Sequence, residues 1–175
     1  MKHAWPSILI LGIASFGFAQ PVAKPDDVKS PEAILAAVYD VISGSAGQKR
    51  DWDRMRSLFA PDAQLSAVVK RGGAEAATRI VMTVEDYVKN SGPALESRGF
   101  FEKEIARRIE SFGGITHVWS TYEARTKVDD AKPLMRGINS IQLMNDGKRW
   151  WVVSIYWQQE SAANPLPEKY LKSGS

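Results

Sequence analysis

Met-Arg-Gly-Ile-Asn-Ser-Ile-Gln-Leu-Met-Asn-Asp-Gly-Lys-Arg-Trp-Trp-Val-Val-Ser-Ile-Tyr-Trp-Gln, residues 135–158, has the pattern of one long β-hairpin. Asp146-Gly147 is a strong hairpin signal, because a type I′ turn needs positive φ at both central residues and this pair tolerates it. A two-residue turn predicts these pairs: Leu143 with Trp150, Ile141 with Val152, Asn139 with Ser154, and Gly137 with Tyr156.

Side chains alternate along a strand, so those eight residues are predicted to share one face of the hairpin. The opposite face carries Trp151 and Trp157 with further apolar residues, and neither face is plainly polar. A hairpin that is apolar on both sides must be covered on both sides. We expect helices over one face and another sheet, long side chains or a second subunit over the other, with Trp151 and Trp157 at the subunit contact.

Polar residues replace the apolar pairs on the first face at the end far from the turn. Asn139, Ser154 and Tyr156 lie there and are predicted to form the floor of a ligand pocket. The alternative is that these three side chains hydrogen-bond to one another or to water, as buried polar groups usually do.

The first nineteen residues have the composition of a secretory signal peptide. Residues 1–3 are a short basic start, residues 8–18 are an apolar run, and residues 17–19 (Gly-Phe-Ala) form a small-x-small cleavage site. The alternative is an uncleaved anchor, although the apolar run is short for a membrane span. The sequence predicts an exported protein, periplasmic or secreted, with a flexible leader over residues 20–30.

The composition argues against several classes of site and partner. The chain of 175 residues has no cysteine, which removes disulfides, thiolate metal ligands and cysteine nucleophiles. Without Lys2, 22 basic residues stand against 20 acidic ones, and no basic stripe for nucleic acid is visible. We expect no metal, no cofactor, no nucleic-acid partner and, after signal cleavage, no membrane partner.

Helices are predicted in the first half of the chain and strands in the second. Helices begin at Ser30, at Asp51 and at Thr83, each of which is a good N-cap residue, and the third is expected to be interrupted at residues 92–93 (Gly-Pro). Short strands are expected over residues 64–70 and 78–82. A long strand is expected over residues 115–125.

Residues 100–112 fit both a helical and a strand period. The tight turn at Gly113-Gly114 and the strand that follows it favour a strand here too. Helices followed by long strands indicate an α+β fold, in which a curved antiparallel sheet wraps around the N-terminal helices. We expect one domain over residues 31–160 and a poorly ordered C-terminal tail over residues 161–175, with Leu166 and Tyr170 as docking points.

The chain resembles the bacterial nuclear transport factor 2-like (SnoaL-like) superfamily over residues 31–160. The resemblance rests on the strand at 115–123, on Gly-Ile-Asn-Ser-Ile-Gln-Leu at 137–143 and on Asp-Gly-Lys-Arg-Trp at 146–150. It implies a cone-shaped, cystatin-like fold with a cavity, often dimeric through the outer sheet face. The superfamily holds isomerases, dehydratases, cyclases and proteins without chemistry, so it carries no catalytic residue over to this chain.

His117 is the only histidine after the predicted cleavage site and is the first candidate for a general base near neutral pH. It shares a strand face with Trp119, and a cavity on that side would place both in the ligand site. A carboxylate partner for His117 would be Glu104, Glu102 or Asp40. The alternative is a structural histidine on a sheet face or in a subunit contact.

Arg107 is a candidate anion clamp for the same site. Together with Trp119, Asn139, Ser154 and Tyr156 it completes the predicted ligand-binding set. The leading hypothesis is an exported domain whose pocket binds a small, mostly apolar molecule. The alternatives are a lyase or isomerase that uses His117 as base, with Tyr156 or Asn139 steadying an oxyanion, and a non-catalytic homodimer that uses the outer sheet face for interaction.

Overall fold

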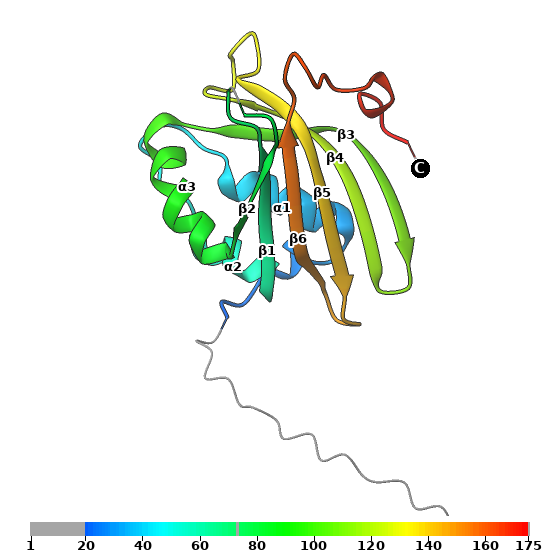
Figure 1. The fold of residues 1–175 in the computed structure, drawn as a ribbon. Coiled ribbons are helices and arrows are strands. Elements are labelled where there is room, and N and C mark those ends of the chain that lie inside the picture. The colour runs from blue at the N-terminus through cyan, green and yellow to red at the C-terminus, as the bar shows by residue number, and fades with distance from the viewer. Residues whose placement is uncertain (1–19, 73, 175) are drawn as a thin grey trace, which may run out of the picture.

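The computed structural model describes residues 20–72 and 74–174, so the predicted signal peptide lies outside the described residues. Six strands form one open sheet in the order β2-β1-β6-β5-β4-β3, and the helices lie on one side of it (Figure 1). The strands are β1 (Phe59–Val69), β2 (Thr78–Met82), β3 (Phe101–Phe112), β4 (Ile115–Arg125), β5 (Met135–Asn145) and β6 (Trp150–Gln159).

The predicted α+β fold is confirmed, and residues 100–112 do form a strand. Every pair of neighbouring strands is antiparallel except β1 and β6, which run parallel. The expectation of a wholly antiparallel sheet is therefore wrong at this one pair. Because the last strand pairs with the first, the C-terminal hairpin lies in the middle of the sheet, between β1 and β4.

Local sequence signals explain where the helices begin. The side chain of Ser30 accepts a hydrogen bond from the backbone N–H of Ala33, and Thr83 and Asp86 form the predicted capping box. The third helix continues through Pro93 instead of breaking there. The helices are α1 (Pro31–Ile42), α2 (Trp52–Leu58) and α3 (Val84–Arg98), with short 3-10 turns at Pro25–Asp27 and Glu168–Tyr170.

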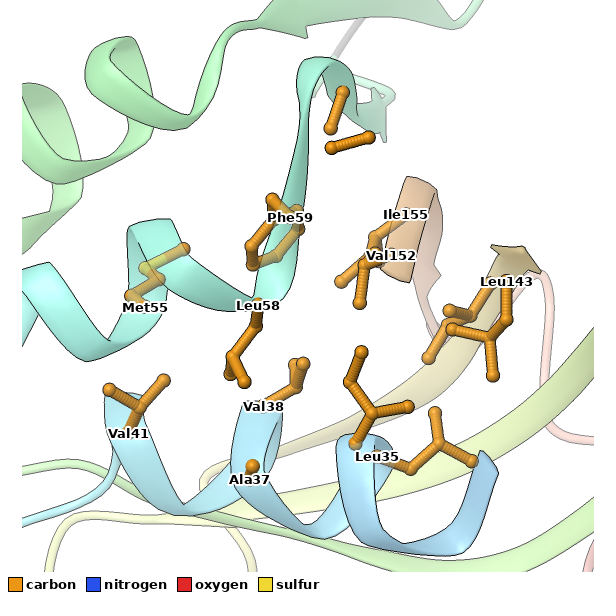
Figure 2. Close-up of a cluster of buried hydrophobic side chains, with 14 of the residues drawn as sticks. Leu35, Ala37, Val38, Val41, Met55, Leu58, Phe59, Leu143, Val152 and Ile155 are labelled. Atoms are coloured by element: carbon orange, nitrogen blue, oxygen red, sulfur yellow. The ribbon is translucent and has the colours of Figure 1, made fainter. Parts of the chain in front are cut away.

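The main core lies between α1 and the sheet face that we call the inner face. Figure 2 shows Leu35 and Val38 of α1 pointing toward Phe59, Val152 and other sheet residues. Leu35 and Val152 have no accessible surface. Each such side chain contributes about 1.5–3 kcal/mol when it is fully buried, so the inner face holds α1 firmly against the strands.

The turn of the C-terminal hairpin is longer than predicted. Asn145 pairs with Trp150, which leaves a loop of residues 146–149 rather than a two-residue turn. The carboxylate of Asp146 accepts hydrogen bonds from the backbone N–H groups of Lys148 and Arg149, both at 2.9 Å, and Gly147 has a positive φ of 88°. The aspartate stabilises the longer loop with its side chain, as Asp does in many turns.

A β-bulge at Val153 changes the faces of β6. Leu143 pairs with Val152 while Gln142 pairs with Ser154, so Val153 is an extra residue between them. One extra residue reverses the alternation of side chains beyond it. Ser154 and Tyr156 therefore lie on the outer face. All four predicted pairs are wrong, since Leu143 pairs with Val152, Ile141 with Ile155, Asn139 with Trp157 and Gly137 with Gln159.

The C-terminal tail contacts the outer face through Tyr170, one of the two docking points predicted from the sequence. The carbonyl oxygen of Tyr170 accepts a hydrogen bond from the hydroxyl of Thr121 at 2.6 Å, and its ring lies 5.6 Å from that of Trp119. The outer face also exposes Ile115 and Met144, which pair across β4 and β5. A homodimer through this face stays a prediction, which the mass of the protein in solution would test.

No helix among the described residues is long and apolar enough to cross a lipid bilayer.

Gly137→Ala is expected to destabilise the protein by about 2 kcal/mol, the scale of overpacking a close contact. A Cβ atom at Gly137 would lie 2.4 Å from the backbone oxygen of Gln158 and 2.6 Å from the hydroxyl of Tyr122. The matched control is Gly72→Ala, since a Cβ atom there meets nothing within 4 Å. Urea unfolding of both variants tests this, and equal stabilities would contradict it.

Candidate functional site

A cavity of about 220 Å³ lies between the inner face of the sheet and the three helices. Its wall is mainly apolar and includes six aromatic side chains. Polar groups reach it at only a few places, chiefly from Ser91, Glu102 and Asn139. The aromatic residues are Tyr39, Phe59, Tyr87, Phe100, Tyr122 and Trp157.

Glu102 is the only charged side chain that lines this cavity in the described part of the chain. It is half-buried and lines both this cavity and a second depression at the edge of the sheet. Burial raises the pKa of Glu102 to about 7, and a hydrogen bond from Asn139 offsets part of this rise. A carboxyl with such a pKa exchanges its proton near neutral pH, as a general acid or base must.

The start of β3 fixes the position of Glu102. The hydroxyl of Ser43, at the end of α1, accepts a hydrogen bond from the backbone N–H of Glu102 at 3.0 Å. Gly44 and Phe100 exchange backbone hydrogen bonds at 2.7 and 2.9 Å just before it. The end of α1 and the first residues of β3 are thereby joined, so the carboxyl is held by two elements rather than by a loop.

Asn139 connects Glu102 to a buried polar chain. Its side-chain amide donates to Glu102 Oε1 at 3.2 Å and to the hydroxyl of Tyr39 at 3.1 Å. The hydroxyl of Tyr39 lies 2.7 Å from that of Ser120, which in turn donates to Glu104. Because the hydroxyl of Ser120 donates its proton to Glu104, it accepts the hydrogen bond from the hydroxyl of Tyr39. Each donor in this series of hydrogen bonds therefore has an acceptor.

The tyrosines of the cavity remain neutral donors. Burial is the largest cause that raises the pKa of Tyr39, Tyr87 and Tyr122, and the nearby charge of Glu102 adds to it. Tyr87 also packs edge-on against Trp157, with ring centroids 6.4 Å apart. The cavity therefore offers phenol hydroxyls and one titrating carboxyl.

Of the residues predicted from the sequence to bind a ligand, only Asn139 lines the cavity. Ser154 and Tyr156 line a separate depression on the outer face, because the bulge at Val153 turns them away. Arg107 lies on the inner face but pairs with Glu104, with Nε 2.5 Å from Oε1, and does not line the cavity.

His117 and Trp119 also lie outside the cavity, on the outer face. Val118 between them is fully buried in the core, so alternation along β4 directs both neighbours outward. The ring of His117 makes a hydrogen bond of 3.0 Å with the hydroxyl of Ser140, and Trp119 packs on Tyr170. The structure thus does not bring His117 to Glu102, to Glu104 or to any residue that lines the cavity.

The sequence pointed to Glu102 only as one of three partners for His117, did not point to Tyr87 or Tyr122, and placed Trp157 at a subunit contact, whereas Glu102 and these three aromatic residues all line the cavity. The alternation of β4 could have found Tyr122, since it shares a face with Val118. Trp157 could not be found that way, because the bulge reverses its face. No group of three or more His, Cys, Asp or Glu side chains that could hold a metal ion occurs within residues 20–72 and 74–174.

Comparison with known proteins supports the fold. No protein-family model matches the chain, and no curated protein sequence matches it. A protein of unknown function with a cystatin-like fold from Nostoc punctiforme superposes with a TM-score of 0.55 at 10% identity, over 75% of this chain and 89% of that one.

A proposed dehydratase of the nuclear transport factor 2-like family from Streptomyces avermitilis gives a TM-score of 0.53 at 13% identity, over 79% of this chain and all of that one. At such identities the likeness concerns the fold alone. The chain has the cystatin-like, nuclear transport factor 2-like fold.

Proposed function

We propose that this domain binds a small, mostly apolar molecule in the cavity of the inner face. The observation that carries the proposal is a cavity whose wall is almost entirely apolar and aromatic, with a single buried carboxyl, Glu102, at one place. Pockets of this composition, with few polar groups that fix orientation, are typical of small-molecule sites.

The volume of the cavity limits the size of the ligand. An apolar cavity of about 150 Å³ holds benzene, and this one measures about 220 Å³. The ligand is therefore one ring, or an aliphatic group of similar size, with a short substituent. The substituent carries the hydrogen-bonding group, because Glu102 and Asn139 would otherwise lose contact with water without gaining a partner.

Proton transfer to Glu102 is the second candidate function, and the pKa of about 7 favours it. A carboxylate in an apolar cavity removes a proton from carbon most effectively when its pKa lies near the working pH. The hydroxyls of Tyr39 and Tyr122 are donors that would steady the negative charge formed on the substrate. The Streptomyces protein with the same fold is a proposed dehydratase, and dehydration also requires a proton acceptor.

Ser91→Trp is expected to abolish binding by filling the cavity from α3. Ser91 lines the cavity and is only half-buried, so the larger side chain enters the cavity without displacing the packed core. Ser97→Trp on the same helix is the control, because Ser97 is exposed and lies outside the cavity. A panel of small apolar compounds is screened by thermal shift.

Compounds that stabilise the wild type should stabilise Ser97→Trp equally and Ser91→Trp not at all. Equal stabilisation of both variants would place the binding site elsewhere.

Glu102→Gln is expected to slow proton transfer by about 100-fold or more, which is the usual contribution of a general base. The probe is 2-indanone in D₂O, whose α-hydrogens exchange for deuterium when a base removes them, and NMR follows the exchange. His117→Ala should stay within about twofold of the wild type, since His117 lies on the other face. Glu110→Gln, at an exposed position of β3, is the control.

Loss of exchange in His117→Ala together with retention in Glu102→Gln would contradict this assignment.

A further inference from the structure

We propose that the ligand is a small hydrophobic amine, held as its ammonium ion by the carboxylate of Glu102 and the surrounding aromatic rings. This inference rests on the proposed binding function and names the chemical class of its ligand. It follows from the signs of the charges that the cavity can carry, from the aromatic wall and from the free oxygen of Glu102.

The charge of the cavity can only be negative. Of the described side chains that line it, Glu102 and three tyrosines are ionisable, and none is a lysine, arginine or histidine. A carboxylate ligand would lie beside Glu102 without a cation to pair with, which is costly in a buried site. A neutral ligand leaves the ionised form of Glu102 uncompensated. A cationic ligand supplies the missing charge.

Glu102 has an oxygen available for the ammonium group. Asn139 donates to Oε1, and no other hydrogen bond to the carboxyl is formed by the residues that the structure describes. Oε2 is also absent from the buried polar atoms that lack a partner, so it is accessible. Since the carboxyl lines the cavity, that accessible oxygen is where a ligand N–H would bind.

The aromatic wall favours a cation over a neutral group of the same shape. Six aromatic side chains line a cavity of about 220 Å³, and ring faces attract ammonium groups within about 6 Å. Aromatic cages recognise quaternary and methylated ammonium groups in this way. The remaining wall is aliphatic and suits the hydrocarbon part of the ligand.

The groups around Glu102 decide how binding depends on pH. Tyr39 from α1, Tyr87 from α3 and Tyr122 from β4 face it, and burial raises the pKa of each phenol. On β3, Glu104 is paired with Arg107. The charged residues that share a second depression with Glu102 at the edge of the sheet are Asp40, Lys103, Glu123 and Arg125.

Those four charges are paired among themselves or with a neighbour. Glu123 lies 3.1 Å from both Lys103 and Arg125, and Asp40 pairs with Arg54. Glu102 is therefore the group whose titration changes the cavity charge between pH 5.5 and 8. With a pKa of about 7, linkage predicts that a cation binds about 30-fold more tightly at pH 8 than at pH 5.5.

The sign follows from the proton balance. At pH 5.5 the free protein holds a proton on Glu102 that an ammonium ion must displace, whereas at pH 8 the carboxylate is already formed. A neutral ligand displaces no proton, so its affinity has no such rise.

The test compares three ligands of nearly the same shape, 2-phenylethylamine, 2-phenylethanol and phenylacetate, by isothermal titration calorimetry. At pH 8 the amine should bind about tenfold more tightly than the alcohol, and phenylacetate should not bind. At pH 5.5 the amine should lose about 30-fold in affinity and bind no more tightly than the alcohol. Glu102→Gln should bind amine and alcohol equally at both pH values, while the exposed control Glu110→Gln should keep the preference.

Equal binding of amine and alcohol to the wild type at pH 8 would overturn the amine proposal and leave the proposed binding function standing. Failure of all three ligands to bind would overturn both. Tighter binding of phenylacetate than of the amine would also overturn the proposal, because a bound carboxylate would need a cationic side chain in the cavity.

Discussion

The packing of α1 against the inner face of the sheet is the contact on which the cavity depends. Leu35 and Ile34 of this helix have no accessible surface, and they close one end of the space between helix and strands. Toward the other end the aliphatic residues give way to Tyr39 and Asn139. The same helix thus completes the core at one end and places Tyr39 at the cavity at the other, on the side of the sheet that the helices cover (Figure 1).

Two carboxyls on β3 lie on the inner face but have different surroundings. Glu104 pairs with Arg107 and accepts a hydrogen bond from Ser120, so its charge is compensated. Among the described residues, Glu102, two positions earlier, accepts one hydrogen bond, from Asn139, and pairs with no cation. A buried carboxyl without a cation costs stability when it ionises. A ligand or substrate that interacts with the Glu102 carboxyl would offset this cost.

The sequence predicted the architecture well because the signals for it are local. The N-caps at Ser30 and Thr83, the turn at Gly113-Gly114 and the hairpin around Asp146-Gly147 each act over a few residues, and all four elements formed. The site was predicted poorly because it depends on which face each side chain occupies. A single inserted residue, Val153, moved Ser154 and Tyr156 out of the cavity.

The face of the sheet also decides the outcome for His117. Its residue type indicates acid–base chemistry, but its position in β4 places it opposite the cavity. Glu102 carries no comparable signal in the sequence, since a single glutamate in a strand is ordinary until the partners from α1 and β5 are placed around it.

Both functions proposed for the cavity depend on the pKa of Glu102 in the folded protein, which can be measured directly. Carbon-13 labelling of glutamate carboxyls, with the Glu102 signal assigned by its loss in Glu102→Gln, allows NMR titration of this one group. We expect a midpoint near 7, because burial without a cation opposes ionisation. A midpoint near the ordinary value of 4.5 would contradict this expectation.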